Sequence, residues 1–113
     1  CHSFPAQPLP YENDLNRPDI CIGTDSYHTS TELKDCLLKV FEAFGYRVAI
    51  DSPFSGTIVP LKHYHKDKRV ASVMIEVNRS LYADPSGFKR VQSDLTHAIL
   101  QAATIRPNHI SGE

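Results

Sequence analysis

The residue with the most unusual setting in this sequence is a glutamate inside an apolar stretch. Glu76 lies in residues 70–79, VASVMIEVNR, a run typical of a buried central strand. Because side chains alternate along a strand, Glu76 shares a face with Ser72 and Met74. A carboxylate is costly to bury unless it is paired, metal-bound or at the open end of the strand, where α/β sheets bind ligands. Glu76 is therefore a candidate general base or acid, and the alternative is a structural strand-end charge or an ion pair with Arg79.

Histidines are the candidate metal ligands. His2 lies in the opening residues CHSF, where a surface role is the usual one and metal binding is the alternative. His63 and His65 are two residues apart, so an extended backbone would place them on one side, as a metal site requires. They lie within residues 62–69, KHYHKDKR, whose positive charge would repel a cation. We therefore expect a solvated loop there, and a loop or helix-cap position for His28.

Cysteine and serine are weaker candidates for chemistry. Cys21 lies in an apolar run, where a thiol is normally inert, and Cys36 lies within a predicted helix. Ser55, in the segment PFSG, lacks the G-x-S-x-G context of a serine hydrolase. The sequence has 3 cysteines, which cannot all pair with one another. This favours reduced thiols in a cytoplasmic protein.

Two helices are predicted to position these residues. The first spans about residues 30–44, begins at a capping box formed by Thr29 and Glu32, and ends at Gly45 in a left-handed conformation. The second begins with a capping aspartate followed by proline, Asp84-Pro85, and ends before Pro107.

Three strands are predicted, at residues 19–23, 46–50 and 70–79. Residues 1–18 are rich in proline, so we expect an irregular segment laid over a surface. Residues 108–113 are expected to be frayed.

The predicted elements follow the order strand, helix, strand, loop, strand, helix. This order predicts an α/β fold with a mostly parallel or mixed sheet and flanking helices, in a single domain over residues 1–113. Two amphipathic helices cover one face of a sheet more easily than both, which indicates that part of the natural sheet is missing.

No apolar run approaches the roughly 18 residues of a membrane span. A net charge of −1 gives no reason to expect a nucleic-acid partner. Neither a membrane nor a nucleic acid is therefore predicted as a partner.

Four short motifs occur in order over about residues 1–88. They are His2-Ser3-Phe4, residues 19–25 (DICIGTD), residues 52–56 (SPFSG), and residues 73–79 (VMIEVNR) followed by Leu81-Tyr82. Together they resemble the N-formylglutamate amidohydrolase family. The resemblance implies a zinc-carboxypeptidase-like, or phosphorylase/hydrolase-like, fold and the hydrolysis of an amide such as that of N-formylglutamate.

The resemblance also implies roles for individual residues. His2 is similar to the last zinc ligand of the family, and Glu76 to the glutamate that activates the zinc-bound water. Arg79 would bind a substrate carboxylate or orient Glu76, and Ser55 and Gly56 would lie in a substrate-covering loop. The implied cofactor is zinc, and the implied partner is a small-molecule N-acyl amino acid.

One departure from the family pattern limits what this chain is expected to do alone. The family's first two zinc ligands, a histidine and a glutamate, belong upstream of His2, where only Cys1 stands here. We therefore expect a C-terminal half of the enzyme domain, completed by the N-terminal half or by a partner subunit.

Two alternative functions stay open at this point. The first is a non-catalytic α/β module that binds an acidic small molecule or a partner protein. The second is an anionic-ligand or nucleic-acid binder that uses residues 62–69, although the rest of the chain is slightly acidic.

Overall fold

The computed structural model describes residues 1–13 and 16–106. The elements follow the order β1 (His2–Phe4), β2 (Ile20–Gly23), α1 (Thr31–Ala43), β3 (Val48–Ile50), β4 (Met74–Asn78), the 3₁₀ helix η1 (Arg79–Tyr82) and α2 (Pro85–Ala102). The expected fraying of residues 108–113 lies outside the described residues. No helix within the described ranges is long and apolar enough to cross a membrane.

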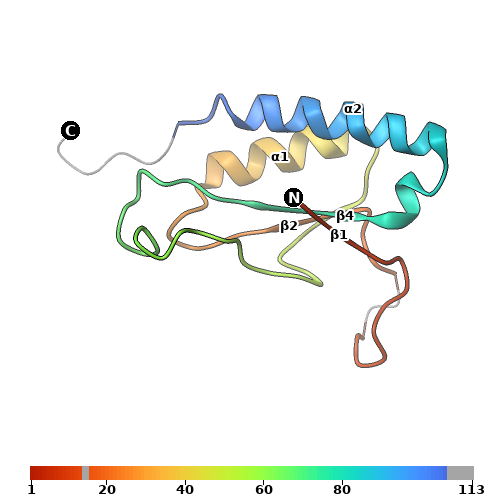
Figure 1. The fold of residues 1–113 in the computed structure, drawn as a ribbon, viewed down its shortest axis with the longest axis horizontal. Helices are drawn as coiled ribbons and strands as arrows, with labels where there is room; N and C mark the ends of the chain where they lie inside the picture. Colours follow the sequence, from red (N-terminus) through yellow and green to blue (C-terminus); the bar gives the residue numbers. More distant parts are fainter. Residues whose placement is uncertain (14–15, 107–113) are drawn as a thin grey trace.

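The described strands form a single sheet in the order β1-β4-β2-β3 (Figure 1). β1 pairs with β4 and β2 pairs with β3 in parallel, whereas β2 and β4 are antiparallel. The predicted α/β fold with a mostly parallel or mixed sheet is confirmed, and β4 is an interior strand as expected.

β4 begins later than the predicted strand. The N–H of Ser72 donates to the carbonyl oxygen of His28 at 3.0 Å, and the carbonyl oxygen of Ser72 accepts from Thr29 Oγ1 at 2.6 Å. These bonds take the place of ladder bonds, so regular pairing starts at Met74. β3 is shortened for a similar reason, because the N–H of Tyr46 still donates to the last turn of α1, at Phe41.

The prediction of an irregular segment was wrong for the first residues of the chain. His2–Phe4 forms β1, which pairs in parallel with β4. Proline begins only at Pro5, so the preceding residues keep the N–H groups that a strand needs. This short edge strand places His2 beside the interior strand that carries Glu76.

The predicted helices are confirmed, with one correction at a cap. The N-cap of α1 is Ser30, whose hydroxyl accepts from the N–H of Leu33 at 3.1 Å. The predicted capping box was wrong because the Thr29 hydroxyl is bonded elsewhere, to Asp25 and Ser72. Gly45 has φ +91°, the left-handed conformation expected at the end of this helix.

α2 begins as predicted. The side chain of Asp84 caps it by accepting from the N–H of Gly87 at 2.6 Å, and Pro85 occupies the first turn.

Both helices cover the same face of the sheet (Figure 1). The alternation of side chains turns the isoleucines and valine of β2 and β4 toward them, and the core is made by Ile20, Ile22, Leu37, Phe41, Tyr46, Ile75, Val77, Val91 and Ala98. The opposite face, which carries Cys21, Met74 and Glu76, is covered by the chain between β3 and β4. The two faces therefore differ in kind: one packs against helices, the other against a loop.

Candidate active site

The site is built on the pairing of β1 with β4. The register places His2 directly opposite Glu76. Neighbouring strands lie about 4.8 Å apart, so side chains at paired positions meet. His2 Nδ1 is 3.3 Å from Glu76 Oε1. The His2 side chain is 54% exposed and that of Glu76 is 11% exposed, so the carboxylate is the shielded partner.

Glu76 faces a cavity of about 390 Å³ on the loop-covered side of the sheet. The floor is formed by strand residues, and the side is formed by residues 54–58, named here the wall. The lining consists of His2, Gly23, Phe54, Ser55, Gly56, Thr57, Ile58, Met74 and Glu76. The cavity therefore has an acidic end near His2 and an apolar end near Met74.

Two glycines allow the wall to approach the sheet. A Cβ atom on Gly23 would lie 2.3 Å from the carbonyl oxygen of Gly56. Gly56 itself has φ +83°, a conformation that residues with a side chain rarely adopt. The motif pair Gly23 and Gly56 thus brings two backbones together that are distant in sequence.

The first residue of the wall is held from below by Cys21. The thiol of Cys21 donates to the carbonyl oxygen of Phe54 at 3.2 Å. Burial raises the pKa of this thiol, as expected for an inert structural cysteine. Cys21 pairs with Glu76 across β2 and β4 and lies on the same face, so it supports the cavity floor.

The ring of Phe54 is held by an aromatic and cationic contact. It lies 5.4 Å from the ring of Phe4, and the guanidinium of Arg17 lies 5.2 Å from its centre. Arg17 is 5% exposed and is paired with Glu12, which raises the pKa of the arginine and lowers that of the glutamate. This contact ties the wall to the strand that carries His2.

The structure brings four of the five predicted site residues to one cavity: His2, Ser55, Gly56 and Glu76. Arg79 is not part of its lining. Arg79 begins η1, and its Nε donates to Ser3 Oγ at 3.1 Å. Among the described ion pairs, the partner of Glu76 is His2 and not Arg79. Sequence reasoning missed Gly23, whose signal was a glycine at the end of an apolar strand.

A profile of the family described as N-formylglutamate amidohydrolase matches residues 1–83. The chain belongs to this family. A comparison with curated proteins found no match.

Two solved structures show how far the likeness to the family extends. The N-formylglutamate amidohydrolase from Ralstonia eutropha JMP134 is 26% identical, with a TM-score of 0.70 over 91% of this chain and 40% of that one. The gene product Atu2144 from Agrobacterium tumefaciens is 21% identical, with a TM-score of 0.61 over the same shares, and shows the fold. This amidohydrolase-family chain therefore spans about 40% of the length of the structures it matches.

The described residues do not by themselves fit a complete zinc site. Within residues 1–13 and 16–106, no group of three or more histidine, cysteine, aspartate or glutamate side chains is arranged to hold a metal ion. A catalytic zinc needs three protein ligands. At the cavity, His2 is the candidate ligand, and the thiol of Cys21 is directed at a carbonyl oxygen.

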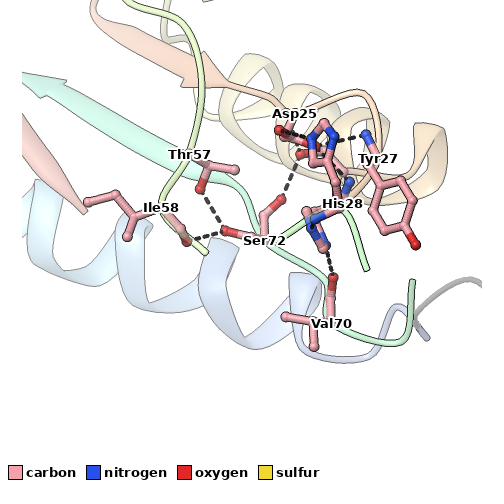
Figure 2. A network of polar contacts seen from close by, with 9 residues as sticks. Asp25, Tyr27, His28, Thr57, Ile58, Val70 and Ser72 are labelled. Carbon is pink, nitrogen blue, oxygen red and sulfur yellow. Dashed lines mark hydrogen bonds and ion pairs between the residues drawn. The ribbon is translucent and has the colours of Figure 1, made fainter. Parts of the chain in front are cut away.

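Two other histidines, His28 and His65, lie together in a separate cluster, and Figure 2 shows His28 beside Asp25 there. His65, expected in a solvated loop, has its Nε2 2.9 Å from Asp25 Oδ2, and this contact lowers the pKa of the Asp25 carboxyl. His28 is 2% exposed, with Nδ1 2.7 Å from the carbonyl oxygen of Val70 and Nε2 2.9 Å from the N–H of His65. The spacing of these residues in the sequence carried no signal of this cluster.

Proposed function

We propose that the protein containing this chain hydrolyses the amide of an N-acyl amino acid, such as N-formylglutamate, in a zinc-dependent reaction. The observation that carries the proposal is the shielded carboxylate of Glu76 opposite His2, at a cavity in a chain of this family. This chain would contribute the acid–base group, part of the substrate cavity and one metal ligand.

Glu76 suits the role of a general base. It is fixed on an interior strand, and its carboxylate faces the cavity, so it can accept a proton from an attacking water. The same carboxyl group can then return the proton to the leaving nitrogen. A rigid strand is a better support for this step than a loop, because the position of the base is set by the sheet.

The coordination of zinc would be completed by residues outside the described cavity. His2 is proposed as one ligand, and the other two would come from an N-terminal half of the domain or from a partner subunit. Bound there, zinc would act as a Lewis acid on the substrate amide and on a water molecule.

Substrate binding is proposed for the wall and for Arg79. Ser55 and Gly56 line the cavity, so the Ser55 hydroxyl and the Gly56 backbone are the groups proposed to contact the substrate. Arg79 is anchored to Ser3, beside His2. Arg79 is not part of the cavity lining, so in this role its guanidinium would have to leave Ser3 and turn toward a substrate carboxylate.

The proposal is tested with Glu76→Gln in the full-length protein. The glutamine keeps the shape of the side chain but cannot take a proton, so turnover should fall by about 10²–10⁴-fold. Zinc measured by mass spectrometry should be unchanged, because Glu76 is not a proposed ligand. Ser80→Ala, on the exposed first turn after β4, is the control for a neutral change nearby. Full activity of Glu76→Gln would remove this residue from the role of base.

A non-catalytic module is the second candidate. It is favoured by the lack of a three-ligand group within the described residues. In that case the cavity would bind an acidic small molecule or a partner protein. A full-length protein that is folded, contains no zinc and turns over no N-acyl amino acid would support the module and contradict the hydrolase.

A further inference from the structure

The wall of the cavity has little support from its own backbone. Within residues 1–13 and 16–106, no hydrogen bond joins the backbone of residues 54–58 to that of another segment. Side chains from elsewhere hold it instead. Cys21 and the contact of Arg17 with the Phe54 ring hold the first residue of the wall. The last residues, 57 and 58, are held by a different side chain.

Ser72 holds the end of the wall with its hydroxyl. Ser72 Oγ donates to the carbonyl oxygen of Ile58 at 2.9 Å, and it lies 2.7 Å from Thr57 Oγ1. A serine hydroxyl carries one hydrogen, and a carbonyl oxygen can only accept. The hydrogen of Ser72 is therefore used on Ile58, and Thr57 must donate to Ser72.

The backbone of Ser72 is fixed as firmly as its side chain. Its N–H donates to the carbonyl oxygen of His28, and its own carbonyl oxygen accepts from Thr29 Oγ1, the residue that precedes the cap of α1. Figure 2 shows Ser72 between these two groups of contacts, with the wall on one side and the Asp25–His28 segment on the other. The wall is thus connected through one residue to the start of a helix.

The Asp25–His28 segment, to which Ser72 is bonded, is held in place by further hydrogen bonds. His28 Nε2 accepts from the N–H of His65, so its hydrogen is on Nδ1 and is donated to Val70. Asp25 accepts from the N–H groups of Tyr27 and His28, so the turn before α1 is fixed by its own side chain. A serine joined to this support has little freedom to move.

We propose that Ser72 is a positioning residue that holds the wall at its working distance from Glu76. Four residues of extended chain span about 13 Å, so Ser72 does not reach the carboxylate and acts through Thr57 and Ile58. The effect on catalysis rests on the proposed function, whereas the effect on the wall does not.

Kinetics of the full-length protein give the first test. Ser72→Ala should raise KM for the N-acyl amino acid about 10-fold and leave kcat within about 2-fold, because the wall binds substrate but lies away from the reacting atoms. Ser72→Thr keeps the hydroxyl and should restore KM. Thr57→Val, which keeps the shape of the side chain, should raise KM about 3-fold and add nothing to Ser72→Ala, since both remove the same contact.

Thiol labelling gives a test that does not need activity. Cys21 is fully buried beneath Phe54, whereas Cys36 is half-buried on α1 and serves as an internal reference. Alkylation by iodoacetamide, followed by peptide mass spectrometry, should be about 10-fold faster at Cys21 in Ser72→Ala and unchanged at Cys36. Ser72→Thr should label as the wild type does.

The outcomes separate this inference from the proposed function. If the wild type hydrolyses no N-acyl amino acid but Cys21 alone becomes reactive in Ser72→Ala, the proposed function fails and the positioning role stands. An unchanged labelling rate at Cys21 overturns the positioning role, and so does an equal rise at Cys21 and Cys36, which would mean general loosening. A Ser72→Thr variant that behaves as Ser72→Ala overturns it as well.

Discussion

Gly23→Ala tests whether close contact between two backbones sets the shape of the cavity. The new methyl group would lie 2.3 Å from the carbonyl oxygen of Gly56 and 3.0 Å from Cβ of Met74. A carbon and an oxygen atom approach to about 3.3 Å in ordinary contacts. The wall at Gly56 must therefore retreat by about 1 Å, since Gly23 is in the interior of the sheet and has less freedom to move.

The expected cost follows from this displacement. Adding a methylene-sized group to a close-packed contact destabilises a protein by about 1–3 kcal/mol. Moving a cavity wall by about 1 Å can lower a rate about 10²-fold when that wall orients the substrate. We therefore expect a smaller free energy of unfolding and a kcat/KM reduced by about 10- to 100-fold.

The measurements are urea unfolding and steady-state kinetics on the full-length protein. Gly45→Ala is the matched control, because it adds the same methyl group where no atom lies within 4 Å. It has φ +91°, so it should cost about 1 kcal/mol through backbone strain and leave kcat/KM unchanged. If Gly23→Ala keeps both wild-type stability and wild-type kcat/KM, the close approach of Gly23 and Gly56 does not shape the cavity.

Two predictions concern groups away from the cavity. Tyr46→Phe removes a 2.6 Å hydrogen bond to Asp94 and should lower the free energy of unfolding by about 1 kcal/mol at pH 7. Burial and Asp94 raise the pKa of Tyr46 to about 12, so this difference should vanish as pH rises from 10 to about 12, as urea unfolding at several pH values would show. Asp25→Asn should be destabilising at pH 7. The contact with His65 lowers the pKa of Asp25, so the difference from wild type should persist down to about pH 4 and shrink below it; a constant difference down to pH 3 would contradict this.

The elements could be predicted because their signals are local. Gly45 and the Asp84-Pro85 pair marked helix ends, and the alternation around Glu76 correctly placed it on the face opposite Ile75 and Val77. These rules depend on neighbours within a few residues along the chain. They do not depend on what the chain meets after folding.

The errors arose where a distant segment decides the local structure. Three residues are too few for a strand to be recognised by periodicity, so β1 became visible only through its pairing with β4. Thr29 matched a capping box, but its hydroxyl is bonded to Ser72, 43 residues further along. His28 and His65, 37 residues apart, form their contact for the same reason. A local sequence pattern contains no information on such partners.

The difference between the two faces of the sheet bears on where changes are tolerated. The helix-covered face buries Ile20, Ile22, Ile75 and Val77, so its substitutions act mainly on stability. On the loop-covered face, the described structure shows no backbone hydrogen bond from the wall, residues 54–58, to another segment, and the wall is held by single side chains such as Ser72. If Ser72 has the proposed positioning role, its loss should shift the wall without opening the core. Substitutions on this face should therefore change substrate binding before they change the free energy of unfolding.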